Sequence, residues 1–299
     1  MKQDIHQQII DRILGLLEQG VIPWRSPYLA KVGVPCNFMS RKRYRGINAF
    51  LLSALRFTSP YFLTFLQAKE LGGHVRKGER GFLVIKYGTY TREQQDDNSG
   101  AAEVPEVKRG YLKGYTVFHA SQLEGIAFPE GTAVPERPRS GACAEAENIV
   151  AGMPRRPGIS HGTAEAFYQR SADRVHMPER KLFTSDEAYF STLFHELSHA
   201  TGHQSRLARK SLLQSKGIES GGEARKVYAE EELVAEMSAA FLNAHAGIVE
   251  AEIESSVAYL RGWISALKTG DAKGWIIRAA AHAQRAANFI LNVPDEAQA

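Results

Sequence analysis

Five residues in the second half of the chain, His195-Glu196-Leu197-Ser198-His199, constrain its fold more than any other feature. On an α-helix, side chains four residues apart emerge on one face, so both histidine rings can reach the same point. Two such imidazoles can bind Zn²⁺, although another divalent transition metal also suits nitrogen and oxygen ligands. The motif therefore predicts His195 and His199 as metal ligands and Glu196 as the general base that activates water.

The residues around the motif predict that it lies on a helix. Thr184 and Glu187 have the spacing of a capping box, and acidic residues in a first turn suit the helix dipole. Phe190 and Phe194 recur at helical spacing, and Gly202 offers an end to the helix. We therefore expect an amphipathic helix between Thr184 and Gly202, with its apolar face buried.

A second predicted helix, over residues 228–242, offers a third metal ligand. It carries a run of glutamates beside small residues that would let it pack closely on the first helix. Glu232 and Glu236 are four residues apart and share a face. We expect Glu232 to complete the metal site and Glu236 to hold a ligand histidine as a hydrogen-bond acceptor. A solvated acidic face is the alternative for such a run, and we expect it for Glu230 and Glu231.

Length and composition predict the broad class of the protein. A chain of 299 residues with 43% hydrophobic and 23% charged residues suits two ordinary globular domains. Two cysteines without metal-binding spacing, no signal-peptide pattern and no membrane-length apolar run predict a cytoplasmic protein without a membrane partner. We expect an α+β fold with a small α+β domain (1–128), a linker (129–140) and a mostly helical domain with a short sheet (141–299).

Positive charge is concentrated in the first part of the chain. Residues 1–125 hold 18 Lys and Arg against 11 Asp and Glu, whereas the remainder holds 19 against 22. Cations interleaved with aromatic rings are typical of single-strand binding, because bases stack on the rings while phosphates pair with the cations. We predict contacts with single-stranded DNA, and with double-stranded DNA as a further option. The predicted DNA-binding residues are Trp24, Arg25, Arg43, Tyr44, Arg45, Asn48, Lys69, Arg76, Lys77 and Arg80.

Hydrophobic periodicity predicts the remaining elements. Helices are expected at residues 4–19, 47–57, 59–73, 251–267 and 274–291, and strands at 82–87, 111–119, 166–169 and 174–178. The last of these strands directly precedes the motif helix. We expect its free edge to accept an extended substrate peptide by strand addition.

Phrases along nearly the whole chain resemble the ArdC family of plasmid antirestriction proteins. Four segments resemble the family's N-terminal single-stranded-DNA-binding domain, which is also similar to the start of plasmid TraC primases: LEQGVIPWRSPY, RYRGINAFLL, FLTFLQAKELGGHVRKGERG and YTVFHASQLEGI. Three more segments resemble its zincin-type metallopeptidase domain: ADRVHMPER, FHELSHATGHQSRL and YAEEELVAEMSAAFL. The resemblance implies a protein that binds single strands and protects incoming plasmid DNA from restriction during conjugation.

Two other functions fit the same residues. In one, the zincin-like domain is a non-proteolytic module on a DNA-binding protein. In the other, the chain is a DNA-anchored protease that acts on DNA-bound proteins, as SprT-like enzymes do. The intact Glu196 favours an active site. The sequence does not identify the protein substrate.

Overall fold

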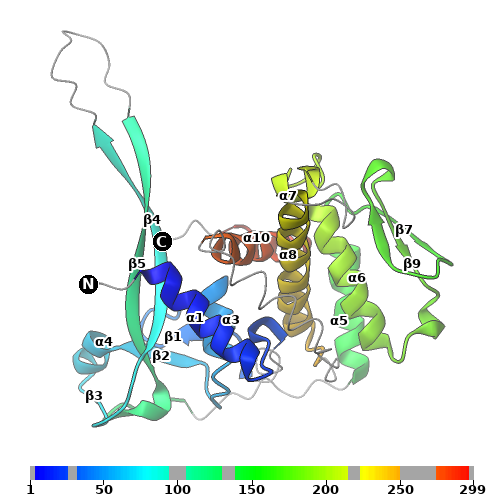
Figure 1. Cartoon of the computed structure of the whole chain (residues 1–299). Coiled ribbons are helices and arrows are strands. Elements are labelled where there is room, and N and C mark those ends of the chain that lie inside the picture. Colours follow the sequence, from blue (N-terminus) through cyan, green and yellow to red (C-terminus); the bar gives the residue numbers. More distant parts are fainter. Residues whose placement is uncertain are drawn as a thin grey trace, which may run out of the picture.

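Within the residues that the structure describes, helices combine with three sheets, which confirms the predicted α+β class. The computed structural model describes residues 4–25, 32–93, 106–129, 139–214, 223–249 and 274–295. Figure 1 shows a large sheet at one end, a small sheet at the other, and the helices between them. Among the described residues, no helix has both the length and the apolar character needed to cross a membrane.

The first half opens with the predicted amphipathic helix, α1 (Ile5–Glu18). Its N-cap is Asp4, whose side chain accepts a hydrogen bond from the backbone of His6. The turn η1 (Pro23–Arg25) and the helix α3 (Ile47–Ser53) follow. Helix α3 is shorter than the expected helix over 47–57, whereas the prediction for residues 4–19 is confirmed.

A four-stranded sheet forms the outer side of the first half, in the order β1-β2-β5-β4. Its strands are β1 (Cys36–Asn37), β2 (Tyr61–Thr64), β4 (Phe82–Glu93) and β5 (Glu106–His119). Strands β1 and β2 are parallel, and the other neighbours are antiparallel. Strands β4 and β5 form a long hairpin (Figure 1) that extends beyond the two strands expected there. A separate pair joins β3 (His74–Val75) to β6 (Leu123–Glu124).

The helix expected at residues 59–73 is wrong in its first part. Residues 61–64 form strand β2 instead, because they pair with β1 on one side and with β5 on the other. Helix α4 (Phe65–Glu70) begins only after this strand. Thr64 and Gln67 form a capping box at that point, which starts the helix where the strand ends.

The second half contains a bundle of helices and a three-stranded sheet. Its helices are α5 (Arg139–Gly152), α6 (Asp186–Thr201), α7 (Lys210–Gln214), α8 (Glu223–Ala246) and α10 (Trp275–Ile290). Its strands are β7 (Gly158–His161), β8 (Phe167–Gln169) and β9 (Arg174–Met177). Short 3-10 turns also occur along the chain: η2 (Ala120–Gln122), η3 (Arg170–Ala172) and η4 (Arg180–Leu182).

The small sheet and the limits of the described residues decide the outcome of the other expectations for the second half. Strand β9 precedes the motif helix but lies in the middle of its sheet, whose order is β7-β9-β8, so the expected free edge on this strand is wrong. The helix expected at residues 251–267 lies outside the described residues. The same holds for residues 130–138 of the predicted linker, and α5 begins at Arg139.

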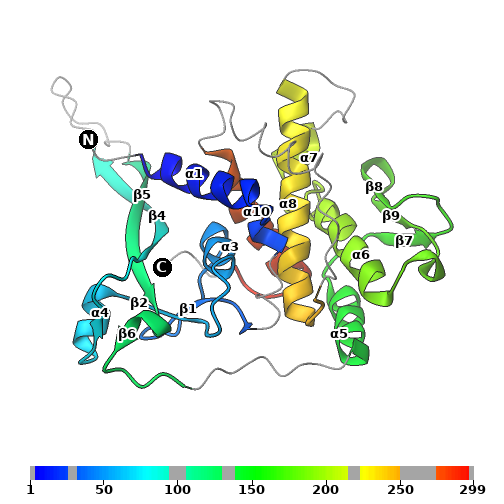
Figure 2. The same cartoon turned by 60° about the horizontal axis from the view of Figure 1, so that its bottom comes forward.

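Helix α8 is the centre of the molecule (Figure 2), where it contacts α5, α6, α7, α10 and η1. Its Leu233, Val234 and Leu242 are each 0% exposed. Helix α10 can pack closely on it because the buried face of α10 is made largely of alanines. These are Ala279, Ala280, Ala283, Ala286 and Ala287, each 0% exposed.

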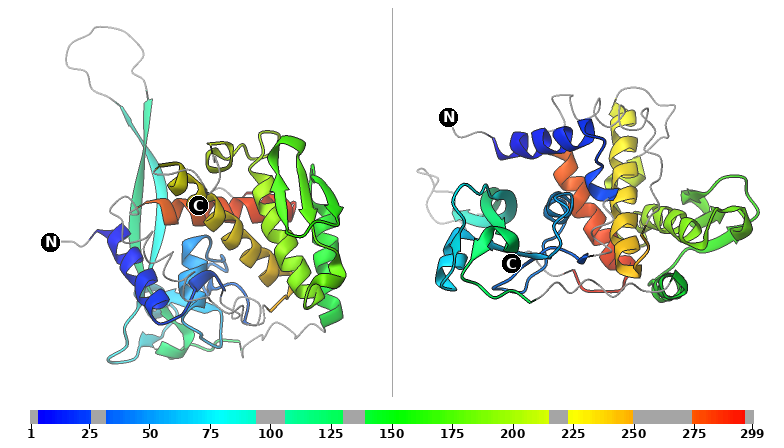
Figure 3. Two further views of the ribbon diagram at one scale, coloured as in Figure 1. Left: turned by 45° about the vertical axis from the view of Figure 1, so that its right-hand side comes forward. Right: turned by 90° about the horizontal axis from the view of Figure 1, so that it is seen from below.

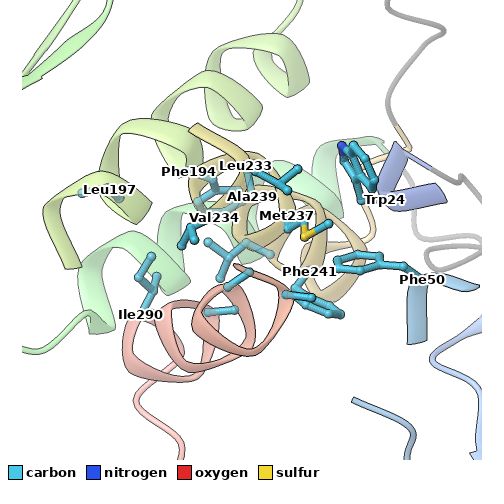
Figure 4. Close-up of a cluster of buried hydrophobic side chains, with 14 of the residues drawn as sticks. Trp24, Phe50, Phe194, Leu197, Leu233, Val234, Met237, Ala239, Phe241 and Ile290 are labelled. Carbon is cyan, nitrogen blue, oxygen red and sulfur yellow. The ribbon is translucent and has the colours of Figure 1, made fainter. Parts of the chain in front are cut away.

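The two halves share one hydrophobic core, drawn in Figure 4. Trp24 and Phe50 come from the first half and lie beside Met237 and Phe241 of α8. The Phe50 and Phe241 rings stack with their centroids 4.4 Å apart. Both views in Figure 3 place α3 next to the helices of the second half, where it contacts α10. The first half therefore packs directly on α8, the helix that carries Glu232.

Trp24 should be a main contributor to this shared core because it is only 1% exposed. We expect Trp24→Ala to lower the free energy of unfolding by about 3–5 kcal/mol, the usual cost of removing a buried large aromatic ring. Urea unfolding followed by circular dichroism measures the change. Phe65→Ala is the matched control, since Phe65 is 56% exposed. Equal effects of the two substitutions would contradict the shared core.

Candidate metal centre

The helix that carries the motif begins one residue later than the sequence predicted. Ser185, rather than Thr184, is the N-cap, and its hydroxyl accepts a hydrogen bond from the Ala188 amide. Helix α6 then ends at the predicted Gly202. Leu197 is 0% exposed and packs in the core, which holds α6 against its neighbours.

The three predicted ligand side chains meet between α6 and α8. The Nε2 atoms of His195 and His199 lie 3.1 Å apart, and each lies 3.5 Å from a carboxylate oxygen of Glu232. Ligand atoms around a tetrahedral Zn²⁺ with bonds of about 2.0–2.1 Å are separated by about 3.3 Å. The donor set therefore fits such an ion. Within the described part of the chain, no other group of three potential ligands has this geometry.

The carboxylate that supports His199 is Glu231, which corrects the prediction for Glu236. His199 Nδ1 lies 3.1 Å from Glu231 Oε1. This contact places a hydrogen on Nδ1 and leaves the lone pair of Nε2 for the metal. Glu231 is 2% exposed, so the expected solvated side chain is also wrong at this position. Glu236 instead accepts a hydrogen bond of 2.6 Å from Arg25 Nε.

Glu231 can be buried as an anion because hydrogen-bond donors surround it. Arg209, itself 3% exposed, donates to its carboxylate from Nε at 2.8 Å and from Nη2 at 2.5 Å. Ser211 donates a further hydrogen bond of 2.6 Å. Burial acts to raise the pKa of Glu231, but Arg209 lowers it to about 2. The same guanidinium donates to the Ser198 carbonyl and the Thr201 hydroxyl at the end of α6.

Glu196 and Tyr228 complete the surroundings of the ligands. Glu196 is 8% exposed and interacts electrostatically with both His199 and Tyr228, so it faces the same site. Burial, together with the neighbouring Glu232, raises the pKa of Tyr228 to about 12. Burial acts against a charged His199, yet the surrounding carboxylates raise its pKa overall. The pKa of Glu232 is lowered, because the two histidines outweigh the effect of its burial.

Sequence reasoning did not assign Glu231, Arg209 or Tyr228 to the site. Helical spacing gives one indication of the burial of Glu231. It lies three residues before Val234 and seven before Ser238, so the three share a face of α8. Val234 and Ser238 are both 0% exposed, so this face is buried. Arg209 is 22 residues from Glu231 in sequence. Its role depends on a tertiary contact that no local pattern shows.

Several of the predicted DNA-contact residues are available at the surface of the first half. Arg45 is 29% exposed and forms an ion pair of 2.9 Å with Asp295. The exposed members of the set lie near strand β1, on α4 and in the turn that leads into β4. They are Arg43, Lys69, Arg76, Lys77 and Arg80.

The other predicted DNA-contact residues are engaged inside the protein. Trp24 is buried in the shared core, and Arg25 forms an ion pair with Glu236 on α8. Tyr44 is half-buried, and burial raises its pKa to about 12. The Asn48 amide donates to the Ile85 carbonyl at 2.7 Å and accepts from the Ile85 amide at 2.9 Å. These side chains connect parts of the structure, so they do not offer a free surface to DNA.

Removal of Arg209 should destabilise the fold by leaving a buried charge without its partner. We expect Arg209→Met to lower the free energy of unfolding by about 3–5 kcal/mol, measured by urea unfolding. The double variant Arg209→Met/Glu231→Gln should recover part of this loss, because the uncompensated charge is gone. Arg156→Met, at an exposed arginine, serves as the control. If the double variant is no more stable than Arg209→Met, the pairing does not have this role.

Both halves of the chain match known protein families. Residues 3–118 match the N-terminal domain of anti-restriction factor ArdC, and residues 144–282 match a zincin-like metallopeptidase family. The protein y4eC of Sinorhizobium fredii is 31% identical over 303 residues, which cover 99% of this chain and 94% of y4eC. DNA primase TraC of Escherichia coli is 33% identical over 307 residues. That match covers 97% of this chain but 27% of TraC, so the chain spans about a quarter of that relative.

Two crystal structures of the antirestriction ArdC protein from plasmid R388 resemble this fold throughout. The metal-free structure is 36% identical with a TM-score of 0.72, covering 98% of this chain and 100% of the other. The Mn(II)-bound structure is 34% identical, also with a TM-score of 0.72, covering 97% and 98%. Since the likeness extends over both halves in sequence and in structure, the chain belongs to the ArdC family of antirestriction proteins.

Proposed function

We propose that this chain is an antirestriction factor that binds single-stranded DNA and carries a metal-dependent peptidase site. The observation that carries the enzymatic part is the meeting of His195, His199 and Glu232 at ion-binding distances. The exposed cations of the first half and its match to the ArdC N-terminal domain support the DNA-binding part. The proposed role of this factor is the protection of incoming plasmid DNA.

His195, His199 and Glu232 would hold one divalent ion, for which we propose Zn²⁺. Catalytic zinc sites use three protein ligands of these types and keep a further position open. The R388 relative has a Mn(II)-bound structure, and nitrogen and oxygen ligands suit both ions. When bound, the ion supplies Lewis acidity toward a carbonyl group and makes water more acidic.

The protein residues would then perform the proton transfers and the positioning. Glu196 takes a proton from the attacking water and can return it to the leaving amine. Tyr228 hydrogen-bonds to Glu232 and so orients that ligand. Strand β8 is an edge strand among the described residues and contacts α6, so an extended peptide could pair with it near the site.

Glu196→Gln should separate metal binding from catalysis. The substitution preserves the size of the side chain and both histidines but removes the base. Metal content, measured by elemental analysis, should stay at the wild-type level, whereas peptidase activity should fall by about 10²–10⁴-fold. His195→Ala/His199→Ala should lose both properties. Full peptidase activity in Glu196→Gln would contradict the assigned role.

Protection of DNA should depend mainly on the first half. The triple variant Arg76→Ala/Lys77→Ala/Arg80→Ala removes exposed cations, so we expect weaker binding to single-stranded DNA and poorer plasmid transfer into a restricting host. Glu196→Gln should retain protection in the same assay. If Glu196→Gln loses protection while keeping metal and DNA binding, protection acts through proteolysis. Cleavage of a DNA-bound protein by the wild type would favour the DNA-anchored protease.

A further inference from the structure

A cavity of about 440 Å³ is lined in part by Arg209 and Ser211, the partners of Glu231, and another of about 570 Å³ lies between the two halves of the chain. The larger one is an open pocket lined by the start of α3, by strand β4 and by helix α10. Its volume lies within the range of about 300–1,000 Å³ that is common for sites of small ligands. In Figure 1, α10 lies between the β4–β5 hairpin and α8. The larger cavity is therefore placed where the predicted DNA-binding half meets the other half.

The charge of the larger cavity favours an anion. Arg278 and Arg285 are exposed on α10, and both line it. Among the described residues, neither forms an ion pair with a carboxylate. Arg45 also lines the cavity and is paired with Asp295. Glu230 on α8 interacts electrostatically with Arg278 from the side of the smaller cavity. The larger cavity thus has two arginines beyond the one that Asp295 neutralises.

An exposed aromatic residue, Tyr87, also lines the larger cavity. Tyr87 on β4 is 51% exposed and is one of the lining residues. The strand is held in place two residues earlier, where the Ile85 backbone is bonded to the Asn48 amide. A flat exposed ring beside exposed guanidinium groups is the combination that binds single-stranded nucleic acid, because bases stack on the ring and phosphates pair with the cations.

The cationic face of α10 continues into the smaller cavity. Arg278, His282 and Arg285 line both cavities, so one helix face is shared by the two. The smaller cavity adds Lys210, which is exposed, whereas its Arg209 is buried and bound to Glu231. A strand bound in the larger cavity would therefore meet one further exposed cation, Lys210, if it continued into the smaller cavity.

We propose that the cavity between β4 and α10 binds a nucleotide of single-stranded DNA, with a base on Tyr87 and phosphates on Arg278 and Arg285. This inference rests on the proposed single-strand binding and extends that surface onto the peptidase half. It assigns DNA contacts to three residues outside the set expected from the sequence. A free nucleotide offers the same chemistry, so the test must distinguish it from a strand.

The test measures binding of a fluorescent oligothymidylate to the full-length protein by anisotropy at several salt concentrations. Each phosphate contact contributes about 0.7 to the salt slope for single strands, so Arg278→Ala/Arg285→Ala should lower the slope by about 1.4. At about 0.1 M salt, the same relation predicts binding that is about 25-fold weaker. Arg278→Lys/Arg285→Lys should retain most of the affinity because the charges remain.

The contribution of the Tyr87 ring to DNA affinity is tested separately. Tyr87→Ala should weaken binding by about 5- to 150-fold, the range expected for loss of one base-stacking contact, whereas Tyr87→Phe should bind like the wild type. The matched control for charge is Arg156→Ala/Lys181→Ala, which removes two exposed cations from the small-sheet side of the peptidase half. This control should keep the wild-type affinity and salt slope.

Several outcomes would overturn the inference. Wild-type affinity and slope in Arg278→Ala/Arg285→Ala would confine DNA contacts to the first half, and the proposed function would survive. Equal losses in the control pair would show a general effect of net charge. Thymidine monophosphate that competes as strongly as the oligomer would identify a site for free nucleotides. A wild type that binds no single strands would end both proposals. If the alanine pair fails to fold by circular dichroism, the Tyr87 variants decide.

Discussion

The ion pair between buried Glu231 and Arg209 is the interaction on which the candidate metal centre depends. Moving a carboxylate out of water costs several kcal/mol unless donors and cations replace its hydration. Arg209 and Ser211 supply these partners, and the arginine does so while also binding the last turn of α6. One guanidinium thereby fixes the relative position of the two helices that hold all three candidate ligands. The candidate ligand side chains are therefore held in position by contacts within the protein.

Local patterns in the sequence were sufficient for the parts of the site that a single helix determines. The spacing of His195 and His199 and the apolar stripe beside them define a helix face whatever surrounds it. Strand β2 shows the opposite case, because its residues form a strand only by pairing with β1 and β5, which are distant in the chain. The choice between Glu231 and Glu236 also depended on which arginine lies opposite each of them.

Trp24 and Arg25 illustrate why residue type alone did not identify the side chains that are available to DNA. A tryptophan next to an arginine can stack on a base, but the same pair can fill a core and neutralise a buried acid. Here the ring is buried against α8, and the guanidinium meets Glu236 on the same helix. Only the packing of the first half on the second distinguishes the two uses. Tyr87, which is exposed on the hairpin, is available for the role that Trp24 does not take.

The shared core also indicates which part of the chain is inherited as one unit in this family. Domains that only touch through a linker can be exchanged singly during evolution, whereas halves that bury each other's apolar surface must be copied together. The match to TraC fits this reasoning, since it covers 97% of this chain within a protein of which it makes up 27%. A recombination event that brought one half to a new protein would expose Phe50 or Phe241 to water. Gene fusions in this family should therefore carry the pair of halves as a single cassette.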